Sequence, residues 1–149
     1  MKKITLIIIG VVIAIIIVKL IPNEKDRLKR NIYSLRDAVE REEKTVVLQY
    51  IDEAYLDPYN TAYEELITSI DDFFRAFDSI RVVMSGLKVK IDSTDAQKTV
   101  FASCSLGLRV FARYEGERVL VFGGIIKPDP IRAYFKKSEE HYRIYAAEY

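Results

Sequence analysis

The chain has 149 residues, about the size of one globular domain. It carries 23 Lys and Arg against 22 Asp and Glu, and half of its residues are apolar. This near-neutral balance argues against nucleic acid as the main partner, because phosphate binding depends on clustered cationic side chains. The apolar content, with 10 Tyr and 7 Phe, excludes a disordered chain. The single cysteine, Cys104, excludes an intrachain disulfide framework and a cysteine-based zinc site.

Residues 4–21 form an apolar segment with the sequence ITLIIIGVVIAIIIVKLI. As a helix, these residues would rise about 27 Å, close to the roughly 30 Å of bilayer hydrocarbon. Lys19 can extend its ammonium group to the lipid headgroups, and Pro22 stops the helix. We therefore expect residues 1–22 to be an uncleaved transmembrane signal anchor that contacts the lipid bilayer, and residues 23–149 to be the folded domain.

A cleaved signal peptide is the alternative, since Lys2 and Lys3 followed by an apolar run resemble its first two regions. No small-x-small cleavage site follows, which favours the anchor. The orientation has two readings. The basic residues after the run outnumber those before it, which favours a cytoplasmic domain, whereas a short basic tail before an apolar run is typical of an exported bacterial chain. We expect a single-pass protein whose domain lies on the periplasmic or extracellular side, with the cytoplasmic side as the alternative.

Three helices are predicted after the apolar segment. Apolar residues recur at helical spacing over residues 26–39, and a second, short helix is predicted over residues 44–54 before Asp57 and Pro58. The third helix is predicted to begin at a capping box of Thr61 and Glu64. Its apolar stripe consists of Leu66, Ile70, Phe73, Phe74 and Phe77.

After Asp78 the apolar period changes from 3.6 to 2, which indicates strands. The parity flips across Ser85 and Gly86, as a β-bulge would produce. A long strand is predicted over residues 100–112, with Gly107 as a candidate bend. Further strands are predicted over residues 119–126, 131–136 and 141–147. Three helices followed by a curved, mostly antiparallel sheet define an α+β fold, in which the helices pack on one face of the sheet.

The segment LRDAVEREEKTVVLQYIDEAYLDPYNTAYEELITSIDDFFRAFDSIRVVMSGLKVKID, followed by the long strand, PDPI and EEHYRIY, resembles the nuclear transport factor 2-like superfamily. The resemblance covers about residues 26–149. It implies a cone-shaped domain with a pocket between the sheet and the helices, often dimeric through the outer face of the sheet. The superfamily includes isomerases, dehydratases, polyketide cyclases and non-catalytic binders, so the fold alone does not select a function.

The predicted pocket wall contains no acid-base group. The inward positions of the long strand are apolar, Cys104 is expected to be an inert buried thiol, and the lone histidine, His141, is expected to be a solvated turn residue. We therefore expect no catalytic residue, no metal site and no cofactor. The expected pocket-lining residues are Phe73, Phe77, Ala102, Cys104 and Leu106. The candidates for the pocket mouth are Tyr55, Asp57 and Tyr59, of which Asp57 is either a turn former or a general base.

Four aromatic residues share outward parity with arginines on the predicted sheet: Phe101, Phe111, Tyr134 and Tyr145. Aromatic side chains and arginine are enriched at the centres of interfaces. The alternative is that these residues reflect strand propensity or are covered by a neighbouring element. We therefore expect a membrane-anchored, non-catalytic binding or assembly domain that forms a homodimer or docks on another membrane or envelope protein. A small apolar ligand in the pocket, with weak isomerase- or cyclase-type activity, is the second hypothesis.

Overall fold

The computed structural model describes residues 23–138 and 140–149. The anchor predicted for residues 1–22 lies outside the described residues. Within the described part, no helix is long and apolar enough to cross a membrane.

The first described helix, α2, spans Glu24–Glu40. It begins at the N-cap Asn23, whose side-chain oxygen accepts a hydrogen bond from the Asp26 N–H at 2.9 Å. Its apolar stripe turns Leu28 and Ile32 toward the sheet, where both are buried. The amphipathic helix expected over residues 26–39 is therefore confirmed and is slightly longer than predicted.

Helix α3 spans Lys44–Gln49, so the prediction that it reaches residue 54 was wrong. The chain leaves the helix because its backbone pairs with the last strand instead. The Asp52 N–H donates to the Ile144 carbonyl at 2.9 Å, and the Ile144 N–H donates to the Tyr50 carbonyl at 2.8 Å. These tertiary hydrogen bonds compete directly with the next turn of helix.

Helix α4 spans Tyr63–Ala76 and begins one residue later than the predicted capping box. Its N-cap is Ala62, whose N–H donates to the Glu65 carboxylate at 3.3 Å. Thr61 does not cap the helix, because its own N–H donates to the Asp57 carboxylate at 2.9 Å. The capping residues were therefore wrong by one position, whereas the helix itself is confirmed.

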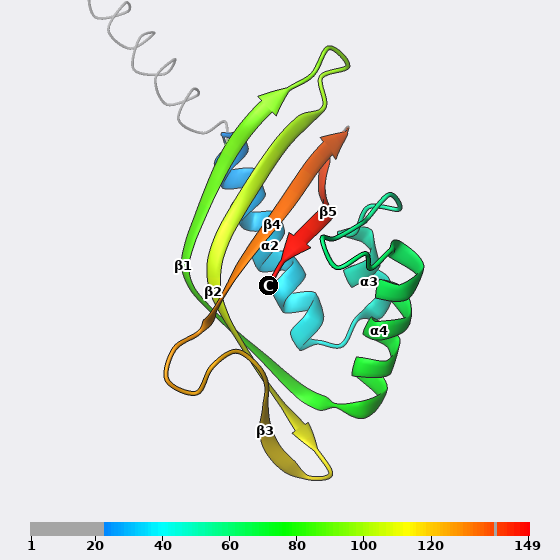
Figure 1. Cartoon of the computed structure of the whole chain (residues 1–149), viewed down its shortest axis with the longest axis vertical. Coiled ribbons are helices and arrows are strands. Elements are labelled where there is room, and N and C mark those ends of the chain that lie inside the picture. Colours follow the sequence, from blue (N-terminus) through cyan, green and yellow to red (C-terminus); the bar gives the residue numbers. More distant parts are fainter. Residues whose placement is uncertain (1–22, 139) are drawn as a thin grey trace, which may run out of the picture.

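Five antiparallel strands form one sheet: β1 (Asp78–Thr94), β2 (Val100–Tyr114), β3 (Glu117–Phe122), β4 (Asp129–Ser138) and β5 (His141–Glu148). Their order is β1-β2-β4-β5. The first part of β2 pairs with β4, and its last part, Val110–Tyr114, pairs with β3. Figure 1 shows the long curved strands crossing in front of α2, with α3 and α4 to one side. The α+β fold is confirmed.

The predicted bulge in β1 is confirmed by a register shift between Ser85 and Lys88 and by a φ of +62° at Gly86. The predicted strand over residues 119–126 was wrong at its end, because β3 stops at Phe122. There the chain turns at Gly123, which has a φ of +88° and where an added Cβ would clash with the Leu108 carbonyl oxygen. Ile125 and Ile126, which continue the apolar pattern, lie in the following loop and are 88% and 95% exposed.

The main core lies between α2 and the inner face of the sheet. Leu28 and Ile32 pack there with Ala102, Cys104 and Phe135. A second cluster joins α2 to the two later helices and contains Ala38, Val47, Ile51 and Tyr55. Because all three helices pack through these two clusters, the outer face of the sheet is not covered by a described helix.

Candidate functional site

An apolar cavity of about 260 Å³ lies between α2 and the inner face of the sheet. Its wall includes Leu35 and Val39 from α2 and Leu106, Leu108 and Val110 from β2. Among the described residues that line it, Arg36 is the one charged side chain, and its Nε donates to the Asp37 carboxylate at 2.8 Å. The cavity can therefore hold a small apolar group, but its lining offers no carboxylate or imidazole to transfer a proton.

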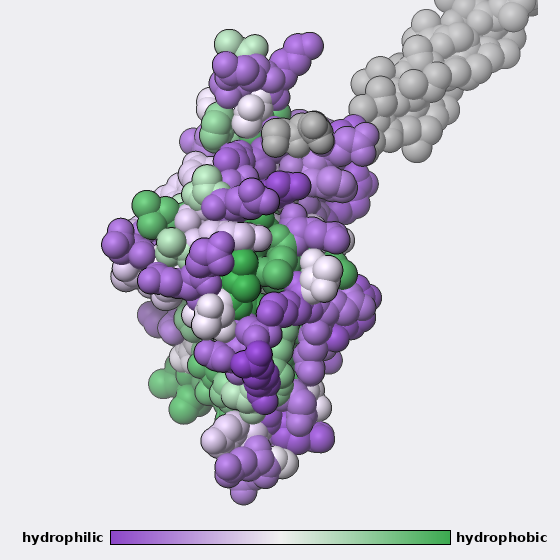
Figure 2. Space-filling model, turned by 90° about the vertical axis from the view of Figure 1, so that its right-hand side faces the viewer, coloured by the Kyte–Doolittle hydropathy of each residue, from purple (hydrophilic) through white to green (hydrophobic). Residues whose placement is uncertain are grey.

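The structure brings only some of the expected pocket-lining residues to this cavity. Cys104 and Leu106 line it, and Ala102 is buried in the adjoining core. Phe73 and Phe77 lie elsewhere: their ring centroids are 5.1 Å apart, and Phe77 packs on Tyr114 at 5.6 Å. The reason is that α4 packs through its apolar side on the second core cluster rather than over the cavity. On the side of the molecule where α3 and α4 lie, Figure 2 shows a central hydrophobic area surrounded by hydrophilic residues.

Cys104 is 3% exposed. Burial raises its pKa to about 11, although a hydrogen bond with the backbone of Ala133 acts in the opposite direction. The thiol is therefore protonated at neutral pH, and the thiolate needed for nucleophilic attack is scarce.

The candidates for the pocket mouth lie together in the loop of residues 55–59, which contacts Tyr149 just after the end of β5. Asp57 is 5% exposed, and its carboxylate accepts hydrogen bonds from the Tyr59 and Thr61 N–H groups, both at 2.9 Å. The hydroxyls of Tyr55 and Tyr149 also donate to it, each at 3.4 Å. Burial would raise the pKa of Asp57, but the hydrogen bonds from Thr61, Tyr59 and Tyr55 outweigh burial and lower the pKa. An ionised carboxylate with this set of donors has the geometry of a turn former.

The two tyrosines of this group have different surroundings. Burial, and then the negative charge of Asp57, raise the pKa of Tyr55, so its hydroxyl stays protonated. Tyr59 is 59% exposed, and its hydroxyl donates to the Tyr149 carbonyl at 2.6 Å. The rings of Tyr59 and Tyr149 lie 4.9 Å apart. Tyr55, Asp57 and Tyr59 thus form one cluster, but none of them lines the apolar cavity.

On the sheet, three of the four expected interface aromatics form a cluster. Tyr145 makes an edge-to-face contact with Phe101 at 6.2 Å and a tilted contact with Tyr134 at 6.3 Å. The Tyr134 hydroxyl donates to the Glu148 carboxylate at 2.9 Å. All three rings are half-buried. The term outer-face cluster is used below for Phe101, Tyr134 and Tyr145.

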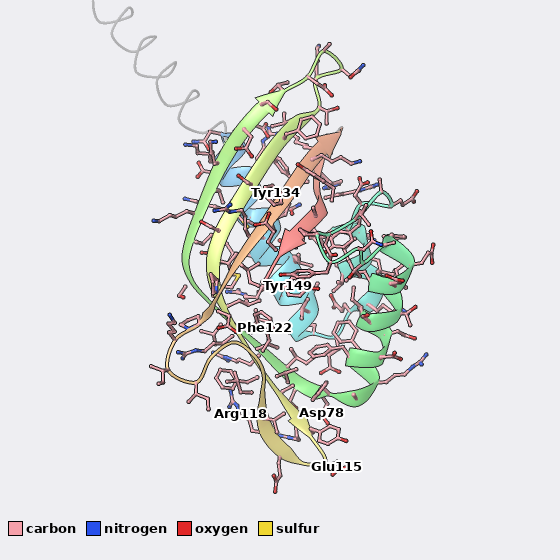
Figure 3. All side chains as sticks on the ribbon, viewed as in Figure 1. Asp78, Glu115, Arg118, Phe122, Tyr134 and Tyr149 are labelled. Atoms are coloured by element: carbon pink, nitrogen blue, oxygen red, sulfur yellow. The ribbon has the colours of Figure 1, made fainter. Side chains whose placement is uncertain are left out.

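The fourth aromatic, Phe111, lies apart from the outer-face cluster. It belongs to the part of β2 that pairs with β3, and the Arg118 guanidinium lies over its ring at 5.3 Å. Figure 3 labels Arg118 on the protruding β3 hairpin and Tyr134 in the middle of the sheet. The shared parity of the four aromatics could not show this separation, because parity does not report position along a strand.

Sequence reasoning missed a groove beside the outer-face cluster. Ser105 lies opposite Lys88 in β1 and Arg132 in β4, and Ser103 lies opposite Lys90 and Tyr134. The short serines leave a hollow of about 440 Å³ between the longer side chains. Only the strand register places these residues together, so no sequence signal short of the register could have found them. No group of three metal-ligating side chains gathers anywhere in residues 23–138 and 140–149.

Comparisons with known proteins identify the fold alone. No protein-family model matches the sequence, and no curated protein matches it. The helical cell shape determining protein Pgp2 (K307A mutant) from Campylobacter jejuni matches with a TM-score of 0.66 and 14% identity, over 85% of this chain. The chain spans 41% of the Pgp2 chain, which is less than half of that protein.

Two further structures match over most of their own length. An NTF2-like protein with a cystatin-like fold from Novosphingobium aromaticivorans has a TM-score of 0.59 and 14% identity, over 84% of this chain and 79% of that chain. An NTF2-like protein from Cytophaga hutchinsonii has a TM-score of 0.56 and 14% identity, over 85% of this chain and 96% of that chain. The described domain therefore has the nuclear transport factor 2-like fold, as the sequence resemblance implied.

Proposed function

We propose that residues 23–149 form a non-catalytic binding or assembly domain, which residues 4–21 hold at a membrane. The domain docks on a second copy or on another membrane protein through the outer face of its sheet. The observation that carries this proposal is the outer-face cluster, in which three aromatic rings contact one another on a face that no described helix covers. Aromatic side chains contribute large contact areas at little cost in conformational entropy.

The surroundings of Asp57 support a non-catalytic role. A general acid or base must be positioned in the pocket with a pKa suited to proton transfer. Asp57, the one carboxylate considered for this role, is occupied by four hydrogen-bond donors, and its pKa is lowered. A low pKa and a saturated hydrogen-bonding shell make Asp57 a poor base and suit it to holding its loop.

The proposal can be tested on the full-length protein extracted in mild detergent, with native mass spectrometry as the readout. We expect the wild-type protein to appear as a dimer or with a co-purifying protein, and Tyr145→Asp to lose that association while keeping its far-ultraviolet circular dichroism. Tyr33→Asp is the matched control, since Tyr33 is 43% exposed on α2 and lies away from the sheet's outer face. A monomeric wild-type protein without a partner would contradict the docking proposal.

A second candidate function is the binding of a small apolar ligand in the inner cavity. The cavity's volume of about 260 Å³ and its apolar wall favour this candidate. Ala133 is part of the wall, so Ala133→Leu would fill the cavity. We expect hydrophobic ligands to raise the melting temperature of the wild-type protein and to raise that of the variant less. A ligand screen without a thermal shift in the wild-type protein would count against a ligand pocket.

A further inference from the structure

A cleft of about 290 Å³ lies between the first half of α2 and the start of β5. Arg27 and Arg30 from α2 line it together with Ser34, and His141 contributes from β5. We propose that this cleft binds the phosphate of an anionic phospholipid headgroup. The inference rests on the membrane anchoring proposed above, because it assumes that α2 begins at a bilayer surface.

The first two turns of α2 carry four basic and two acidic residues, and the structure draws one of the acids toward the sheet. The carboxylate of Glu24 is directed at the sheet, where the Lys137 ammonium and the Tyr142 hydroxyl donate to it. Of the two acidic residues in these turns, Asp26 is the one that is exposed. The exposed bases are Lys25, Arg27, Lys29 and Arg30. Because the sheet holds the Glu24 carboxylate, these two turns expose four cations against Asp26 and a partly exposed Glu24.

The cleft itself has the chemistry of a phosphate site. Guanidinium groups bind phosphate through paired N–H donors, and Arg27 and Arg30 place two of these groups on one side of the cleft. Arg27 remains within 3.8 Å of the Glu24 carboxylate, which balances part of its charge. Glu140, the one acid in the lining, is exposed. The Asn31 side chain donates to the Tyr142 carbonyl at 3.2 Å, so the cleft has a fixed floor that joins α2 to β5.

The position of the cleft along α2 fits the thickness of a headgroup layer. The apolar segment ends two residues before the N-cap Asn23. Arg27 and Arg30 follow Glu24 by about 4.5 Å and about 9 Å along the helix axis. Side chains on a helix tilt toward its N-terminus, which brings both guanidinium groups back toward the bilayer. Arg27 therefore lies within reach of a headgroup layer about 5–8 Å thick on each side, whereas Ser34, about 15 Å beyond Glu24, marks the end of the cleft farther from the bilayer.

The test uses the full-length protein in mild detergent, with native mass spectrometry after addition of phosphatidylglycerol or phosphatidylcholine. We expect the wild-type protein to retain phosphatidylglycerol preferentially and the Arg27→Gln, Arg30→Gln double variant to bind it about 30-fold more weakly. The matched control is the Lys88→Gln, Lys90→Gln double variant, which removes the same amount of charge from the groove beside the outer-face cluster. We expect this control to retain the lipid like the wild-type protein.

Three outcomes would overturn the inference. Equal retention of the two lipids would show that the cleft does not select anionic headgroups. Equal weakening in both double variants would show a general charge effect rather than a site. Binding of sn-glycerol 3-phosphate as tight as that of phosphatidylglycerol would assign the cleft to a soluble phosphate. Flotation with phosphatidylcholine vesicles separates these failures from a failure of the anchor, because a protein without an anchor would not float with the vesicles at all.

Discussion

Lys137 in β4 and Glu24 in the first turn of α2 form a two-point ion pair across 113 positions of sequence. The Lys137 ammonium lies 2.9 Å from one carboxylate oxygen of Glu24 and 3.0 Å from the other. Lys137 is 8% exposed, and the Tyr142 hydroxyl donates to the same carboxylate at 2.6 Å. This arrangement fixes the start of α2, directly after the predicted anchor, to the sheet.

We expect Glu24→Gln to lower the free energy of unfolding by about 1–2 kcal/mol, because it leaves the buried Lys137 ammonium without a counter-charge. The partial exposure of the Glu24 side chain keeps this value below the cost of breaking a fully buried pair. The measurement is urea unfolding of a fragment spanning residues 23–149, followed by far-ultraviolet circular dichroism.

The control is Glu43→Gln, since Glu43 pairs with Arg41 at 3.3 Å on the surface. We expect its cost to be below about 0.5 kcal/mol. The double variant Glu24→Gln, Lys137→Met should lose less unfolding free energy than the sum of its two single variants, because it also removes the unpaired ammonium of Lys137. Equal effects of Glu24→Gln and Glu43→Gln would show that the pair contributes no more than an exposed one.

The same pair predicts how stability depends on pH. Burial raises the pKa of Glu24, but the hydrogen bonds from Tyr142 and Lys137 outweigh burial, so the folded-state pKa lies below the ordinary value of 4.5. The unfolded chain therefore binds this proton more readily, and stability falls as the pH drops. We expect the difference in unfolding free energy between the wild type and Glu24→Gln to be constant near neutral pH and to shrink below about pH 4.5. A difference that stays constant down to pH 3 would contradict this prediction.

Two five-residue loops of the protein share one hydrogen-bond pattern. In the loop 57–61, the Thr61 N–H donates to the Asp57 carboxylate, and the Asn60 N–H donates to the Asp57 carbonyl. In the loop 95–99, Thr99 and Lys98 donate to Asp95 in the same way. The fourth residue of each loop has a positive φ, +70° at Asn60 and +65° at Lys98. The sequences DPYNT and DAQKT are therefore two versions of one turn.

This repetition predicts opposite responses to glycine. Lysine is strained in the left-handed region, whereas asparagine tolerates it. We expect Lys98→Gly to raise the free energy of unfolding by up to about 1 kcal/mol and Asn60→Gly to leave it nearly unchanged. Urea unfolding of both variants checks this, and a loss of stability in Lys98→Gly would show that the loop conformation is not limited by strain at this residue.

The sequence predicted β1 well because its side chains alternate between a more buried and a more exposed face, which leaves a period-2 pattern on each side of the bulge at Ser85 and Gly86. The prediction from sequence failed where an apolar pattern continues in the chain although the strand or helix has already ended. Ile125 and Ile126 extend the apolar run of β3, yet the turn at Gly123 has already ended the strand. The end of α3 was missed because the competing hydrogen bonds come from β5.

The candidate sites were less predictable than the fold. Periodicity assigns a side chain to a face, which sufficed to bring Cys104 and Leu106 to the cavity wall. It does not report which element covers that face, so Phe73 and Phe77 were expected in a pocket that α4 does not reach. The pair of Glu24 and Lys137 depends on the register of β4 and on the docking of α2, neither of which the sequence displays.

The two matching loops also separate the roles of Asp57 and Asp95. Asp57 is buried and binds two tyrosine hydroxyls in addition to two N–H groups, whereas Asp95 binds the Thr99 N–H alone through its side chain, among the described residues. Removing Asp57 leaves more donors without a partner. We therefore expect Asp57→Ala to lose about two to three times as much unfolding free energy as Asp95→Ala.

The position of Asp57 sharpens this comparison, because its loop is attached to the last strand. The Leu56 N–H donates to the Tyr145 carbonyl at 3.1 Å, and Tyr59 holds the carbonyl of Tyr149. Amide hydrogen exchange should therefore accelerate at Leu56 in Asp57→Ala and remain unchanged there in Asp95→Ala. Equal stability losses with no change in exchange at Leu56 would mean that Asp57 does not hold its loop against β5. The alternative role of Asp57 as a general base would then be favoured.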